Sequence, residues 1–153
     1  MSGALAPDAR AGVVTVPEMK KALVAAGLEV YRTRGEIICL ADRVRENLLM
    51  DAGAFVGVGE AMRVGIVVRV QASDFPGEAE AQLFERARAV AASAIPAGYR
   101  EVAAQMQRVA DPGDALRTLD TWCEVQLEKP VADLAGAVDE ARRAVAFDKA
   151  VSR

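Results

Sequence analysis

The chain has 153 residues, a net charge of −3 and a hydrophobic content of 52%, which fit a globular domain that buries about 70% of its unfolded surface. The net negative charge argues against a general affinity for nucleic acid or for anionic membranes. The chain contains no histidine, which removes the commonest general base, the commonest metal ligand and every Ser-His or Cys-His nucleophile. We therefore expect a protein that is not an enzyme and holds no cofactor or metal.

The N-terminal residues carry mostly small side chains, and we expect residues 1–13 to form a flexible N-terminus. They lack the basic and then apolar order of a signal peptide. No apolar run approaches the roughly 18 residues of a membrane-spanning helix. We expect a cytoplasmic protein with a single domain at residues 14–149 and a tail at residues 150–153.

The first predicted element is a helix. Thr15 and Glu18 match the pattern of a capping box, Pro17 falls in the first turn, and Gly27 is suited to end the helix. Apolar residues recur between these signals at helical spacing, at Met19, Leu23 and Ala26.

A hairpin is predicted next, with strands at residues 28–33 and 36–41 and a turn at Arg34-Gly35. Residues 42–53 combine a charged half with an apolar half, so a short helix and an extended edge segment both remain open. Residues 54–58 indicate a further strand, and residues 59–61 a turn. The glycines there precede a strand and do not open a helix, so they indicate a hairpin turn and not a phosphate loop.

Residues 62–71 give the cleanest pattern in the chain. Apolar residues occupy every second position from Met62 to Val70, which places them on one face of a strand. Most of them are β-branched, as suits a pleated and half-buried surface. We predict that this segment is a central strand of an antiparallel sheet, and its other face carries Arg63, Gly65, Val67, Arg69 and Gln71.

The second half of the chain predicts a helix, a hairpin and a last helix. Residues 73–77 break the sheet, a helix runs to about residue 95, and residues 96–98 end it. Alternating segments at 101–107 and 118–128 flank a strong turn signal at 111–114. Asp133 can cap the last helix, whose apolar face carries Leu134, Val138, Ala141 and Val145. The predicted fold is α+β, in the order α-ββ(ββ)-α-ββ-α, with a mostly antiparallel sheet and helices packed on one face.

Several polar or reactive groups have a plain structural interpretation. Asp120, Glu124 and Glu128 share one strand face, and we interpret them as a solvated face because no base or metal motif accompanies them. Cys39 and Cys123 match no metal spacing, and we interpret them as buried reduced thiols.

Four residues are candidates for contact with a partner. Trp122, the only tryptophan, shares its strand face with Asp120 and not with the apolar set, so exposure at an interface and burial by a neighbouring element both remain open. Val67 is a weaker case of the same kind. Arg63 and Arg69 could bind an acidic group, or they could pair across strands with a carboxylate.

The order of elements resembles the type III secretion chaperone-like fold, in particular its YbjN-like family. The segments that carry the resemblance are 18–31, 63–88 and 120–145, and it extends over about four-fifths of the chain. A strand at 54–58 is additional to that topology. The resemblance implies a homodimeric, non-enzymatic bacterial protein that binds or regulates other polypeptides, and it assigns a role to no single residue.

We expect a protein-binding adaptor, chaperone-like or regulatory domain that acts through a sheet face or edge. Its partner would be another protein, a second copy of the chain, or both. The alternative is a small-molecule-binding regulatory domain with a pocket between the sheet and the helices. An enzyme that uses only carboxylates and arginines would require two carboxylates with shifted titration in one cleft.

Overall fold

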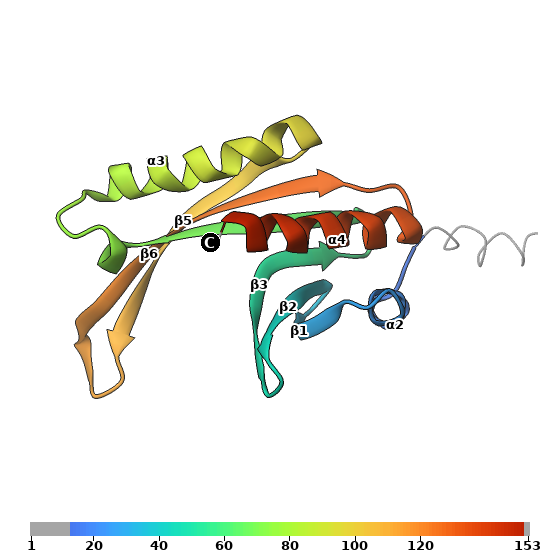
Figure 1. The fold of residues 1–153 in the computed structure, drawn as a ribbon, viewed down its shortest axis with the longest axis horizontal. Coiled ribbons are helices and arrows are strands. Elements are labelled where there is room, and N and C mark those ends of the chain that lie inside the picture. Colours follow the sequence, from blue (N-terminus) through green and yellow to red (C-terminus); the bar gives the residue numbers. More distant parts are fainter. Residues whose placement is uncertain (1–12, 152–153) are drawn as a thin grey trace, which may run out of the picture. The chain divides into compact units, whose positions relative to one another are not determined.

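The computed structural model describes the backbone of residues 13–151 and the side chains of residues 13–147 (Figure 1). In chain order its elements are α2 (Val16–Ala25), β1 (Glu29–Arg34), β2 (Ile37–Arg45), β3 (Leu48–Gly57), β4 (Arg63–Gln71), η1 (Ala72–Asp74), α3 (Glu80–Ala91), η2 (Ala92–Ala97), β5 (Arg100–Asp111), β6 (Asp114–Pro130) and α4 (Leu134–Val151). The strands form one antiparallel sheet in the order β1-β2-β3-β4-β6-β5, and the helices pack on it. The predicted α+β class and the predicted order of elements are therefore confirmed.

The described chain divides into two compact units. One unit extends to Gly65 and resumes at Lys129, and the other is Ile66–Glu128. The first therefore holds α2, β1, β2, β3 and α4, and the second holds η1, α3, η2, β5 and most of β4 and β6. Residues 1–12, which we expect to be flexible, lie outside the described residues, as do residues 152 and 153.

Helix α2 begins and ends as its sequence predicts. The Thr15 hydroxyl accepts a hydrogen bond from the Glu18 backbone N–H, and the Glu18 carboxylate accepts one from the Thr15 N–H, each at 3.3 Å. Gly27 ends the helix with φ at +88°, and the N–H of Leu28 reaches back to the carbonyl of Leu23 at 3.0 Å. This pattern is a Schellman motif, which needs a left-handed residue at the glycine position.

Residues 42–53 form the distal half of the β2–β3 hairpin. Asp42 pairs with Met50 and Arg43 with Leu49, and the chain turns at residues 46 and 47. The helical alternative for this segment is therefore wrong. Pairing with the preceding strand decides its conformation, because the segment itself has no clear period.

Strand β4 buries the face that its alternation predicts. Val64, Ile66, Val68 and Val70 are at most 8% exposed. On the opposite face, Gly65 leaves room for the ring of Phe55, since a Cβ atom there would lie 2.0 Å from the Phe55 Cζ atom. A glycine in this strand therefore marks a close approach of an aromatic ring.

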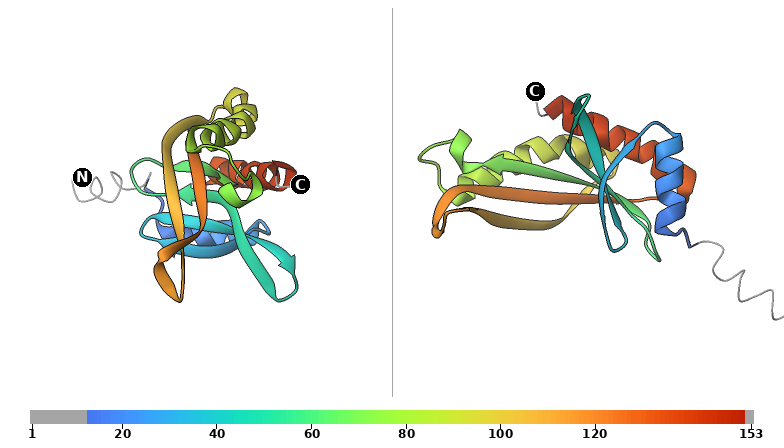
Figure 2. Two further views of the ribbon diagram at one scale, coloured as in Figure 1. Left: turned by 90° about the vertical axis from the view of Figure 1, so that its left-hand side faces the viewer. Right: turned by 90° about the horizontal axis from the view of Figure 1, so that it is seen from below.

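Helix α4 packs on β3 and on α2 within the first unit (Figures 1 and 2). It runs to Val151, so it includes residues 150 and 151 of the expected tail, since neither glycine nor proline interrupts the sequence there. Its buried face includes a carboxylate, because Glu140 is only 4% exposed. Lys129 Nζ and Arg143 Nη1 each lie 3.0 Å from Glu140 Oε1, so two cations compensate this buried charge.

In the second unit, helix α3 packs beside the β5–β6 hairpin (Figure 2). Leu83, Ala87 and Ala91 form the buried side of α3, and each is at most 3% exposed. Arg88 of α3 donates two hydrogen bonds to Glu101 of β5, at 2.9 and 3.0 Å.

Candidate functional site

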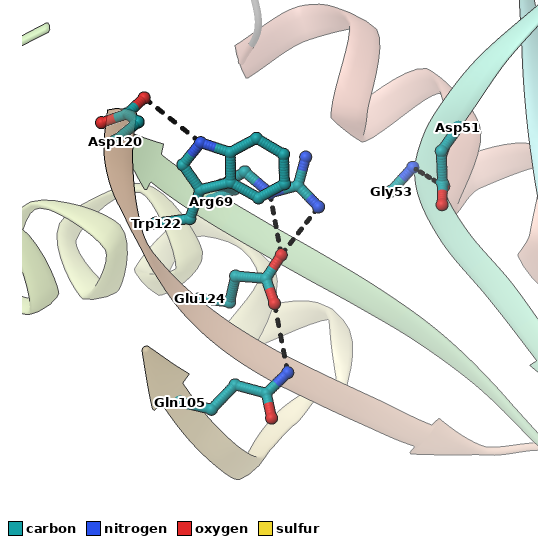
Figure 3. Close-up of polar contacts among 7 residues, drawn as sticks. All are labelled: Asp51, Gly53, Arg69, Gln105, Asp120, Trp122 and Glu124. Atoms are coloured by element: carbon teal, nitrogen blue, oxygen red, sulfur yellow. Dashed lines mark hydrogen bonds and ion pairs between the residues drawn. The ribbon is translucent and has the colours of Figure 1, made fainter. Parts of the chain in front are cut away.

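The centre of the candidate site is a stacked pair of side chains on neighbouring strands (Figure 3). The guanidinium carbon of Arg69 on β4 lies 4.1 Å from the centre of the Trp122 ring on β6, well within the range of a cation–π interaction. The Arg69 side chain is 40% exposed, and Trp122 is half-buried. Trp122 is thus neither a core residue nor a fully exposed one, and Arg69 covers part of its ring.

A buried carboxylate fixes the position of Arg69. Arg69 Nε and Nη2 donate to the same oxygen of Glu124, at 2.8 and 2.7 Å, and Gln105 of β5 donates to the other oxygen at 3.1 Å. Glu124 is only 5% exposed. A carboxylate this buried requires a charged partner and further hydrogen bonds. The pair therefore holds the guanidinium in place over the ring.

A second carboxylate holds the indole from its other end. Asp120 accepts hydrogen bonds from the Trp122 indole N–H at 3.2 Å, from the Ser73 hydroxyl at 2.8 Å and from the Ser73 backbone N–H at 3.0 Å. The Thr121 backbone N–H donates a fourth, at 2.8 Å. Desolvation raises the pKa of Asp120, but these hydrogen bonds outweigh it and hold the pKa below its ordinary value. The short helix η1, which carries Ser73, thus anchors the tryptophan strand.

Strand β5 extends the site with amide side chains. Gln105 lies opposite Glu124 in the β5–β6 register, and Gln107 lies opposite Trp122. Both glutamines are exposed. We call Arg69, Gln105, Gln107 and Trp122 the Trp122 surface. It lies wholly within the second unit, and its chemistry is an aromatic ring, a neutralised cation and two amides.

The other two predicted contact residues, Val67 and Arg63, are not part of the Arg69–Trp122 stack. Val67 is half-buried and lies two positions before Arg69 on the same face of β4. Arg63 belongs to the first unit, six positions before Arg69, or about 20 Å along a strand. Its guanidinium donates to the Ala61 carbonyl at 3.0 Å and lies against Gly57. The structure therefore joins Arg69 with Trp122 within the second unit, whereas Arg63 makes its described contacts within the first unit.

The interpretation of the carboxylates needs correction. Glu124, expected on a solvated face, is buried beneath Arg69, and Asp120 is half-buried within its hydrogen bonds. Two interpretations of Arg69 were open from the sequence, and the structure agrees with one of them, because Arg69 pairs with a carboxylate on the neighbouring strand. No sequence pattern indicated Ser73 or Gln105, because their contacts depend on the register and on the turn after β4.

The two cysteines are buried and free, as the sequence predicted. Burial, with a smaller effect of the Glu80 carboxylate, raises the pKa of the Cys123 thiol. A buried thiol with a raised pKa is a poor nucleophile.

Among the described residues, no group of three or more histidine, cysteine or acidic side chains could hold a metal ion. No helix within the described part of the chain is both long and apolar enough to cross a membrane. Comparison with known proteins gave no match to a family model, to a curated protein or to a solved structure.

Proposed function

We propose that the chain is a non-enzymatic, protein-binding adaptor or chaperone-like domain and that the Trp122 surface contacts its partner. The single observation that carries this proposal is the Arg69–Trp122 stack, fixed at 4.1 Å above a carboxylate that is 5% exposed. Tryptophan and arginine are the side chains most enriched among residues that dominate binding energy. Holding them in position beforehand lowers the entropy that a partner must overcome.

The composition of the surface indicates the kind of partner. Glu124 neutralises Arg69, and the neighbouring β5 side chains are the uncharged amides of Gln105 and Gln107. Such a face offers an aromatic contact and hydrogen bonds to the amides of a polypeptide, but little net charge. We therefore expect binding to a polypeptide with a weak dependence on salt concentration, in contrast to an interface built on charge attraction.

Affinity capture tests the proposal. The immobilised chain is incubated with lysate of the source organism, and retained polypeptides are quantified for the wild type, Trp122→Ala and Leu116→Ala. Leu116 is the matched control, because it lies on the same strand and is 92% exposed. We expect Trp122→Ala to lose a stoichiometric polypeptide that Leu116→Ala retains. Equal retention by both variants, or no retained polypeptide, would contradict the proposal.

A further inference from the structure

Strand β5 is an open edge of the sheet. It comes last in the strand order, so within the described chain only β6 pairs with it, and its other side presents unpaired backbone groups. It extends over 12 residues, and residues 100–108 are all exposed. It contains no proline and no lysine, the residues that commonly keep an edge strand from pairing with another chain.

The opposite edge of the sheet is protected. Strand β1 has six residues, and its pairing with β2 is irregular between Val30 and Arg32. Arg32 and Arg34 add two like charges to this short strand. A short, irregular and basic edge resists pairing with a copy of itself. The sheet thus has one blocked edge and one open edge.

The open edge carries exposed apolar side chains. Its register against β6 shifts between Glu101 and Ala103 and again beyond Val109, and the seven residues between these shifts are paired regularly. In this stretch Ala104 and Met106 lie opposite the buried Val125 and Cys123. Met106 is nevertheless 48% exposed, and Val102 is 45% exposed. Apolar side chains on the buried face of an edge strand lose this exposure if a further strand is added beside them.

The charges of β5 are complementary to those of an antiparallel copy. Arg108 lies opposite Thr121 near the end of the strand, on the face that carries Met106. Glu101 lies opposite Leu127 near the start, and the register shift between Glu101 and Ala103 brings it to the same face. Antiparallel pairing around a two-fold axis keeps equivalent faces on the same side. If this pairing is centred on Gln105, Arg108 of each copy lies opposite Val102 of the other copy, next to Glu101.

Glu101 and Arg108 can each form a further hydrogen bond with a second copy. Glu101 accepts two hydrogen bonds from Arg88, and a carboxylate can accept further donors. Arg108 donates through Nε to Thr118, which leaves the rest of its guanidinium fork for a second carboxylate. Pairing centred on Gln105 also sets Met106 of each copy opposite Ala104 of the other.

We propose that β5 pairs antiparallel with β5 of a second copy of this chain, centred on Gln105, and joins two sheets into one. The contact consists of backbone hydrogen bonds, a Met106–Ala104 cluster and two Glu101–Arg108 ion pairs. Gln105 and Gln107, whose side chains belong to the Trp122 surface, contribute backbone groups to this contact, whereas Trp122 lies on β6 and Arg69 on β4, outside the seam.

Sedimentation equilibrium over a range of concentrations tests the self-pairing. The wild type should be a dimer. Met106→Lys, which places two like charges at the seam, should raise the dimer dissociation constant at least about tenfold. Tyr31→Lys is the control, because Tyr31 is 41% exposed on the β1 edge, and it should remain a dimer. A wild type that is monomeric, or a dimer unchanged by Met106→Lys, would overturn the proposal.

A charge exchange tests the register. Arg108→Glu and Glu101→Arg should each weaken the dimer about tenfold, because each brings like charges together twice. The double variant restores opposite charges across the seam and should recover the starting constant to within about threefold, with Arg88→Gln present in all four proteins so that the Arg88–Glu101 pair within each copy does not contribute. Circular dichroism confirms that each variant is folded. Failure of the double variant to recover would overturn the proposed pairing. Trp122→Ala should remain dimeric, which separates self-pairing from the contact that Trp122 makes with a partner.

Discussion

Removal of the Arg69 guanidinium should expose how much the buried carboxylate depends on it. In Arg69→Met, an aliphatic side chain of similar length keeps contact with Trp122, while Glu124 retains Gln105 as its hydrogen-bond donor. Loss of one partner of a fully buried ion pair costs about 3–5 kcal/mol. Because the Arg69 side chain is 40% exposed, water reaches the carboxylate when the arginine is gone. We therefore expect a loss of about 2 kcal/mol in the free energy of unfolding.

A double-mutant cycle with Glu124→Gln isolates the ion pair. The amide needs no cation, so Arg69→Met combined with Glu124→Gln should cost about 1–1.5 kcal/mol less than the sum of the two single changes. Urea unfolding at pH 7 measures all four proteins, with the m-value as a check on compactness. Arg117→Met is the control, because Arg117 is 69% exposed and lies 3.5 Å from its carboxylate; it should cost less than about 0.5 kcal/mol. Additive effects within about 0.3 kcal/mol would refute the argument that the pair holds Arg69.

Three further predictions concern other contacts. Gly65→Ala should cost about 2 kcal/mol of stability in thermal unfolding, because the new Cβ atom would lie 2.0 Å from the Phe55 ring; Phe55→Leu in the same chain should recover part of this loss, and an unchanged melting temperature would refute the close approach. The Asp120 carboxylate, whose pKa is lowered in the folded state, contributes stability above its unfolded pKa that is lost as the pH falls through its folded pKa; Asp120→Asn should therefore lose less stability than the wild type below about pH 4, and parallel pH profiles would argue against it. Lys129→Met should cost about 1 kcal/mol and Arg143→Met less than about 0.5 kcal/mol by urea unfolding, because their side chains are 29% and 69% exposed beside the same buried carboxylate; equal costs would contradict this ranking.

Local signals in the sequence predicted most of the fold. The capping box at Thr15 and the left-handed Gly27 fix one helix, and the alternation from Met62 to Val70 fixes the buried face of β4. Each depends on residues close together in the chain. Residues 42–53 lacked such a signal, and their strand conformation comes from pairing with residues that precede them. Sequence patterns therefore predicted the elements whose conformation depends on nearby residues, and did not predict the segment whose conformation depends on pairing with another strand.

The candidate site was only partly predictable, because its contacts join distant parts of the chain. The alternation in β6 singled out Trp122 correctly as a residue outside the apolar set, but it could not show that Arg69, 53 positions earlier, covers its ring. The same alternation assigned Glu124 to a solvated face. The burial of Glu124 depends on the side chains of the neighbouring strands, Arg69 of β4 and Gln105 of β5. The alternation within β6 alone cannot predict which side chains these are.

The central claim, that the Trp122 surface contacts a partner polypeptide, is tested most directly by site-specific photo-crosslinking in the source organism. A photoreactive amino acid replaces Gln107, which is exposed and lies opposite Trp122. The control position is Ile95, which is 49% exposed in the same unit but lies on η2. We predict an adduct with a different polypeptide from position 107, in addition to the crosslinks between copies that the proposed β5 pairing places there, and no adduct from position 95. No adduct from position 107, the same adduct from both positions, or crosslinks only between copies of the chain would contradict the claim.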